Sequence, residues 1–216
     1  MNLLIIPTLQ SCSFIFFTKN SKILEHTILD KSKTFSETIM FSKNWEMVEN
    51  IFFISGPASF TTLRNMSVFL ETLKNFSENA NNKKYNFYNI STQDFLENFI
   101  LYIDTDINKL SHLFTYAVGR QEVFIFEESK KYQKIKNKKL KEYIQNNNYK
   151  TISGFLSENI INIIKEINNI KYLNLEHNLE NNIDYNKIIS EIITTNNKKL
   201  FSNNIKIDYG SLPTIG

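Results

Sequence analysis

Short hydrophobic runs follow one another closely at the start of the chain. Residues 3–6 and 12–17 are apolar and are joined by a short connection that contains Pro7, and a third run, 23–29, follows a turn-prone Lys-Asn-Ser. Runs of this length and spacing predict three consecutive strands that pair as an antiparallel meander. A fourth run, 51–54, is uniformly apolar, which predicts a strand covered on both faces.

Residues 60–76 repeat their apolar positions with the period of an α-helix. At about 100° per residue these positions form one broad stripe. The stripe consists of Leu63, Met66, Phe69, Leu70, Leu73 and Phe76. Two interpretations stay open: the helix is well buried in its own fold, or one flank of the stripe packs on the sheet and the other contacts a second protein.

The rest of the chain alternates strand and helix patterns. Residues 85–90 predict a half-buried strand, after which Ser91 caps a second helix with an apolar face. Residues 114–118 and 122–126 predict a hairpin. Residues 130–150, rich in Lys and Asn, predict a solvated helix and loop, and 155–167 and 185–193 predict helices on either side of a strand at 172–175. This order predicts an α/β fold.

Composition excludes several classes of function. The chain has 216 residues, 42% of them hydrophobic, which is enough for a sizeable core. Its net charge is only +3, with scattered lysines, so charge does not favour direct nucleic-acid binding. The single cysteine, Cys12, excludes an internal disulfide and a cysteine-based zinc site. No segment reaches the ~20 apolar residues of a membrane-spanning helix, and we expect a cytoplasmic protein with no membrane partner.

One stretch carries candidate chemistry: Ser55-Gly56-Pro57-Ala58-Ser59, between the fourth strand and the first long helix. Gly56 permits backbone angles closed to other residues, and Ser59 is a good N-cap. A strand, a glycine turn and a helix start aim N–H groups at one point, as in anion sites. No Walker lysine or G-x-G-x-x-G accompanies the turn, so the residues alone favour an ordinary strand-to-helix connection over a phosphate cradle.

Catalytic constellations are mostly absent from the sequence. The three histidines, His26, His112 and His177, are widely separated and have no metal-ligand spacing. Asp104 and Asp106 are close enough for a metal or acid–base pair, but a loop between two lobes explains them as well. We therefore predict no catalytic residue and no metal ligand.

The nonapeptide 56–64 resembles the G-P-G-S-F-T-G-L-R signature of the TsaB (YeaZ) family, accessory subunits of the bacterial machinery that makes threonylcarbamoyladenosine on tRNA. Ala58 and Thr62 replace two glycines of the signature. The matching positions are Gly56, Pro57, Ser59, Phe60, Thr61, Leu63 and Arg64. Ser91-Thr92 is similar to the Ser-Thr of the family's V-S-T-L-E-A-L element, and Arg120 and Glu122 match its D-A-R-R-G-E-V-Y hairpin.

Two regions depart from the family pattern. Where the family's first hairpin carries I-D-T-S, this chain has Ile6-Pro7-Thr8-Leu9. Pro7 has no carboxylate and no amide hydrogen, which speaks against a metal, nucleotide or phosphoryl-transfer role for this hairpin. The family's long helix between residues 30 and 49 is indicated only by Ser36-Glu37-Thr38-Ile39.

The resemblance implies a two-lobed actin-like ATPase or ribonuclease H-like α/β fold, with mixed sheets flanked by helices. Its lobes are residues 1–103, with the partner-binding helices, and 104–216. It implies a non-catalytic scaffold that pairs with a TsaD-type subunit, which modifies adenosine 37. A TsaE-type ATPase is a further candidate partner, the isolated chain can form a homodimer, and tRNA is contacted only indirectly. The predicted partner-binding residues are Phe60, Leu63, Met66, Phe69, Leu70 and Leu73.

An enzyme is the alternative. A small actin-fold ATPase or kinase acting on its own would use residues 56–59 for phosphate and Asp104 or Asp106 for Mg²⁺. No cofactor is assigned to the chain itself, and the question of ATP or ADP at the subunit junction stays open.

Overall fold

The fold is described from a computed structural model of the chain. The residues whose structure is described are 1–7, 13–20, 22–29, 33–79, 84–103, 111–118, 121–127, 132–176, 189, 193 and 205–209. Contacts divide the chain into two compact units, which are unit 1 (Met1–Thr92 with Asn186–Gly216) and unit 2 (Gln93–Tyr185). The division expected from the sequence, 1–103 and 104–216, differs from this one in two segments: residues 93–103 belong to unit 2 and residues 186–216 to unit 1.

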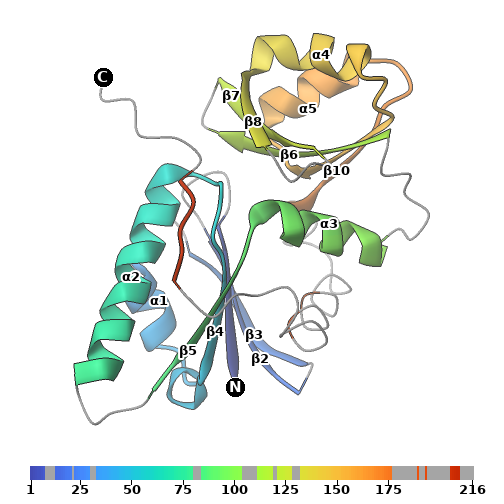
Figure 1. The fold of residues 1–216 in the computed structure, drawn as a ribbon. Coiled ribbons are helices and arrows are strands. Elements are labelled where there is room, and N and C mark those ends of the chain that lie inside the picture. The colour runs from blue at the N-terminus through green and yellow to red at the C-terminus, as the bar shows by residue number, and fades with distance from the viewer. Residues whose placement is uncertain are drawn as a thin grey trace, which may run out of the picture. The chain divides into compact units, whose positions relative to one another are not determined.

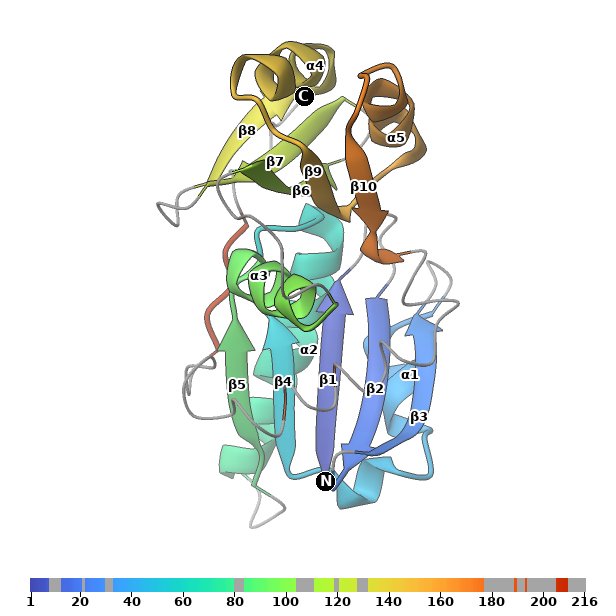
Figure 2. The same cartoon turned by 90° about the vertical axis from the view of Figure 1, so that its right-hand side faces the viewer.

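Unit 1 is built on a mixed five-stranded sheet with the order β3-β2-β1-β4-β5, which can be followed across Figure 2. Its strands are β1 (Asn2–Pro7), β2 (Ser13–Lys19), β3 (Lys22–Leu29), β4 (Asn50–Ile54) and β5 (Asn86–Ile90). The first three pair antiparallel, which confirms the predicted meander. β4 runs parallel to β1, and β5 runs parallel to β4. All four residues from Ile51 to Ile54 are buried, as the uniformly apolar run predicts.

Helices α1 (Phe35–Met40) and α2 (Phe60–Asn79) lie on the same face of this sheet in Figure 1. The rings of Phe35 and Phe69 stack 5.7 Å apart and join the two helices. The 3₁₀ turn η1 (Trp45–Met47) follows α1. The Trp45 and Tyr85 rings stack with their centroids 5.3 Å apart, and Trp45 is 9% exposed, so it is a packing residue.

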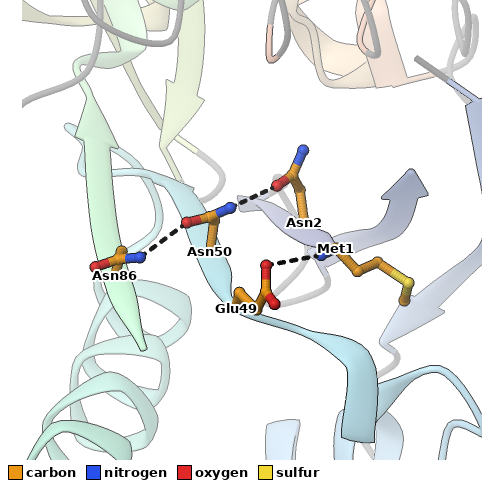
Figure 3. A network of polar contacts seen from close by, with 5 residues as sticks. All are labelled: Met1, Asn2, Glu49, Asn50 and Asn86. Carbon is orange, nitrogen blue, oxygen red and sulfur yellow. Dashed lines mark hydrogen bonds and ion pairs between the residues drawn. The ribbon is translucent and has the colours of Figure 1, made fainter. Parts of the chain in front are cut away.

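Three asparagines align the amino ends of the parallel strands of unit 1 (Figure 3). Asn2, Asn50 and Asn86 are neighbours in the register of β1, β4 and β5. The Asn86 side-chain amide donates to the Asn50 side-chain oxygen, and the Asn50 amide donates to that of Asn2, each at 3.0 Å. Beside them, the amino group of Met1 lies 3.5 Å from the Glu49 carboxylate. A shift of register would break these side-chain bonds, so they help to specify the pairing.

Unit 2 repeats the strand plan of unit 1. Its sheet has the order β10-β9-β6-β7-β8. After α3 (Thr92–Ile103), its elements are β6 (His112–Val118), β7 (Glu122–Phe126), β8 (Tyr132–Lys136), α4 (Asn137–Asn146), β9 (Thr151–Phe155), α5 (Glu158–Lys165) and β10 (Lys171–Asn174). The first three strands again form an antiparallel meander, and β9 and β10 add parallel strands on its other side. Two such mixed sheets with flanking helices make the actin-like, ribonuclease H-like α/β fold, and the predicted fold class is confirmed.

Two predictions in unit 2 are right only in part. Residues 130–150 contain the predicted helix, α4, but they also contain strand β8, and Leu140 and Ile144 of α4 are buried. The predicted helix 155–167 is α5, which begins at Glu158, and the strand β9 (Thr151–Phe155) before it was not predicted. Both missed strands are five residues long. Lysines interrupt the apolar pattern of β8, and Ser153 and Gly154 interrupt that of β9. Pairing with neighbouring strands outweighs these weak local preferences.

The other predicted elements lie close to those observed. The hairpin formed by β6 and β7 and the strand β10 are confirmed. Within the predicted helix 185–193 the described residues are Ile189 and Ile193, and both are helical and fully buried.

Candidate functional site

The nonapeptide 56–64 forms the connection from β4 to α2 together with the first helical residues. Ser55, just after β4, donates its amide hydrogen to the Ile90 carbonyl at 2.8 Å. The Thr92 amide donates to the Gly56 carbonyl at 2.9 Å, and the Thr92 hydroxyl donates to the Pro57 carbonyl at 2.9 Å. The bond between Gly56 and Pro57 is cis. The end of β5 therefore holds the turn through the Ser55 amide, and Thr92 holds it through the carbonyl groups of Gly56 and Pro57.

Gly56 is required by both its backbone angle and its surroundings. Its φ is +107°, in the region that favours glycine. A Cβ at this position would lie 2.0 Å from the carbonyl oxygen of Asp208 and 3.1 Å from Cδ1 of Leu63. The glycine thus allows a distant part of the chain to approach the turn, which the sequence pattern does not reveal.

Ser59 occupies the N-cap position that the sequence predicts. α2 begins at Phe60, and the Leu63 amide donates to the Ser59 carbonyl at 2.9 Å. Ala58 and Thr62, the two positions that depart from the signature, are each 1% exposed. Both side chains therefore lie inside the fold.

A short C-terminal segment, residues 205–209, lies against this turn. The Asp208 amide donates to the Ser55 carbonyl at 2.7 Å, and the Tyr209 ring lies 5.3 Å from that of Phe60. An anion on this side of Gly56 would face the Asp208 carbonyl oxygen, which repels it. The geometry therefore favours the ordinary strand-to-helix connection over the phosphate cradle.

The predicted partner-binding residues of α2 are core residues of this structure. Leu63, Met66 and Leu70 are fully buried, and Phe69 and Leu73 are 5% exposed. Phe60 is half-buried. Phe76 was expected on the same stripe but is 57% exposed. The stripe is thus the face by which α2 packs in its own fold. The opposite face is the one that α2 exposes for contact with a partner.

That opposite side is here called the α2 outer face. It is defined by the exposed residues Thr61, Arg64, Asn65, Val68, Glu71, Thr72, Asn75 and Phe76. Val68, near its middle, is 61% exposed. Two of these residues, Thr61 and Arg64, belong to the signature. The signature therefore divides into positions that build the turn and core and positions that are presented to solvent.

The other residues weighed in the sequence as candidates are dispersed or lie outside the described part of the chain. Arg120, Asp104, Asp106, Cys12 and His177 are outside the described residues. Glu122 forms an ion pair with Lys134 at 3.2 Å. His112 is buried, with its Nε2 atom 2.6 Å from the Ser153 hydroxyl, whereas His26 is exposed.

The described residues hold neither a metal site nor a membrane-spanning helix. They contain no group of three His, Cys, Asp or Glu side chains placed to hold a metal ion. None of the helices within the described ranges has the length and apolar character needed to cross a membrane.

No protein-family model and no curated protein sequence matches the chain. Among solved structures it is similar to YeaZ from Pseudomonas aeruginosa, with 10% sequence identity and a TM-score of 0.42. That alignment covers 62% of this chain and 63% of the other. A second structure is an uncharacterized Pseudomonas aeruginosa protein with similarity to peptidase YEAZ, with 12% identity, a TM-score of 0.41 and 62% coverage of each chain. The chain thus spans less than two thirds of the length of either protein. YeaZ is the other name of the family whose signature the nonapeptide resembles.

Proposed function

We propose that this chain is a non-catalytic accessory subunit of the machinery that makes threonylcarbamoyladenosine on tRNA, and that it binds a TsaD-type catalytic subunit. The observation that carries the proposal is the nonapeptide 56–64. It matches the family signature at all but two positions, and it forms one structural unit, the β4–α2 turn with the start of α2. The repeated ribonuclease H-like strand order is the fold that the resemblance implies.

The α2 outer face is the part of the signature helix that a partner can reach. Thr61 and Arg64 are three residues apart and Val68 follows four later, so their side chains are neighbours on one side of the helix. Arginine is enriched at the energetic centres of interfaces because it combines charge, directed hydrogen bonds and a flat apolar surface. A helix of 20 residues is about 30 Å long. It can supply part of the roughly 800 Å² that each partner buries in a standard interface.

An accessory subunit without chemistry of its own acts through the conformation of its partner. It raises the partner's activity when it binds the active conformation more tightly than the inactive one, and only by that difference in affinity. In this mechanism the β4–α2 turn sets the position of α2, and the outer face of α2 makes the contact.

A charge reversal at Arg64 tests the proposal. The chain is co-expressed with a TsaD-type subunit, and the affinity of the purified pair is measured by calorimetry. We expect a stable complex that Arg64→Glu weakens at least about tenfold, an effect of the size of an interface hot spot. Lys43→Glu is the matched control, because Lys43 is also exposed but lies outside α2, and it should change the affinity less than about twofold.

Two results would contradict the proposal. One is the absence of a complex between the wild-type chain and the TsaD-type subunit. The other is ATP turnover by the isolated chain with Mg²⁺, which would favour an enzyme. Charges at Met66 or Phe69 are unsuitable probes, because these residues are 0% and 5% exposed and a buried charge would unfold the helix whether or not it binds a partner.

A further inference from the structure

Residues 205–209 form an extended segment that lies beside the first turns of α2, in red in Figure 1. We call this segment the strap. Its Asp208 amide donates to the Ser55 carbonyl at 2.7 Å, and the Asp208 carbonyl fills the space left by the absent side chain of Gly56. Tyr209 places its ring against Phe60, with the centroids 5.3 Å apart. The strap therefore contacts signature residues through both its backbone and a side chain.

The attachment is local. Ile205, Ile207, Asp208 and Tyr209 are half-buried and Lys206 is exposed, in contrast to the fully buried residues of β4. The contacts described here, a main-chain hydrogen bond and an aromatic pair, are made by residues that are only half-buried. Segments attached in this way can open and close while the rest of the fold stays intact.

We propose that the strap is an internal substitute for an extended segment of the partner. The surface that it covers accepts a main-chain N–H at the Ser55 carbonyl and an aromatic side chain against Phe60. An extended peptide with an aromatic residue just after the donating amide fits the same two contacts. The partner segment has to displace the strap. The apparent affinity of the complex is therefore the intrinsic affinity multiplied by the fraction of molecules in which the strap is detached. This inference rests on the proposed function.

Two variants release the strap without changing the turn itself. Asp208→Pro removes the amide hydrogen donated to Ser55, and Tyr209→Ala removes the ring that contacts Phe60. Tyr172→Ala is the matched control, since Tyr172 is a partly exposed tyrosine, 39% accessible, on β10 of unit 2. We expect each strap variant to bind the TsaD-type subunit about three- to tenfold more tightly than wild type, and the control to bind as wild type does.

Hydrogen exchange of the full-length chain gives a readout that needs no partner. The Asp208 amide should exchange far faster than the amides of β4, because the strap opens by itself, and faster still in Tyr209→Ala. The Thr92 amide, which donates to Gly56, should remain protected in both variants. In the complex, the Asp208 amide of the wild-type chain should lose its protection altogether.

The outcomes distinguish a failure of the inference about the strap from a failure of the proposed function. If both strap variants bind the TsaD-type subunit as tightly as wild type or more weakly, the inference about the strap is wrong and the proposed function stands. An Asp208 amide protected as strongly as those of β4 also overturns it, because the segment would then be part of the core. If no form of the chain binds the TsaD-type subunit, the proposed function fails, and the strap fails with it as a substitute for that partner's segment.

Discussion

The two units share one strand order, yet they connect the fourth strand to its helix differently. In unit 2, β9 reaches α5 through Leu156 and Ser157, whereas in unit 1 the connection from β4 to α2 takes residues 55–59. Both helices follow a serine whose carbonyl accepts the amide four residues on, at 2.9 Å in each case. Because unit 2 makes the same connection without a Gly-Pro turn, the fold does not require one. What the turn of unit 1 adds is room at Gly56 for the close approach of Asp208 in the strap.

Among the described residues, the two glycines with positive φ also differ in what they approach. Gly154 lies within β9, and a Cβ there would be 1.8 Å from the carbonyl oxygen of Thr115 on the neighbouring β6. Gly56 lies after its strand, and its Cβ would meet the strap. Gly154 thus allows two strands of a sheet to pair closely, and Gly56 allows a separate segment, the strap, to approach the turn.

The largest effect is expected from Gly154→Ala. The added methyl group would clash with the backbone of β6, and the φ of +142° is unfavourable for alanine. Neither strand can move without breaking the sheet, so we expect the free energy of unfolding to fall by at least about 4 kcal/mol. Chemical denaturation measures it, and Thr151→Ala on the same strand should cost about 1 kcal/mol or less. A loss for Gly154→Ala as small as that of the control would contradict the clash.

A smaller effect is expected from Gly56→Ala. The backbone strain at φ +107° costs about 1–3 kcal/mol, but the strap can leave and so relieve the clash with Asp208. Denaturation should therefore show a smaller loss than for Gly154→Ala, and hydrogen exchange should show release of the Asp208 amide. If the variant is as unstable as Gly154→Ala, the turn is as fixed as the sheet and the contrast between the two glycines is wrong.

The fold was predictable where one local pattern decided an element. The uniformly apolar run before Ser55 predicted β4, and the two strand-like runs on either side of Gly119 predicted the β6–β7 hairpin. The strands β8 and β9 were not predictable in this way, because lysines in one and Ser153 with Gly154 in the other are poor strand formers on their own. Their structure comes from partners that are distant in the sequence, and local periodicity carries no information on those partners.

The candidate site was predictable only in part, for a similar reason. The resemblance found the signature, and the rules for turns and caps explain Gly56 and Ser59. The same stripe of apolar residues on α2 serves equally as a core face or as a binding face, and only burial decides between them. The contact of Asp208 with Ser55 is made by main-chain atoms, so no side chain reveals it. Ser91 is recognisable as the cap of α3, but nothing in the sequence marks Thr92, the first residue of that helix, as the donor to the turn.

The helices between the third and fourth strands of each unit begin in different ways. α4 in unit 2 follows β8 directly, and the first amide of the helix, that of Asn137, donates to the Gln121 carbonyl at 2.8 Å. α1 in unit 1 is fixed locally by a capping box, in which the Glu37 carboxylate accepts the Thr34 amide at 2.8 Å and its hydroxyl at 2.9 Å. The start of α1 should therefore depend on pH, whereas α4 begins on a main-chain bond that carries no titratable group.

Thr34→Ala tests the local cap and should have the smallest effect. The bond from the Thr34 amide, followed by that from its hydroxyl, holds the pKa of Glu37 below its ordinary value of 4.5. A lowered pKa means that the cap stabilises α1 above pH 4.5 and loses this contribution as the pH falls through the lowered value. Removing the hydroxyl should raise the pKa part of the way towards 4.5, because the amide bond remains. NMR titration of the Glu37 carboxyl group measures this, with Thr72→Ala on α2 as a control that leaves the pKa unchanged. An unchanged pKa in Thr34→Ala would mean that the backbone amide alone holds the carboxylate, and that the hydroxyl serves only to accept the Glu37 amide.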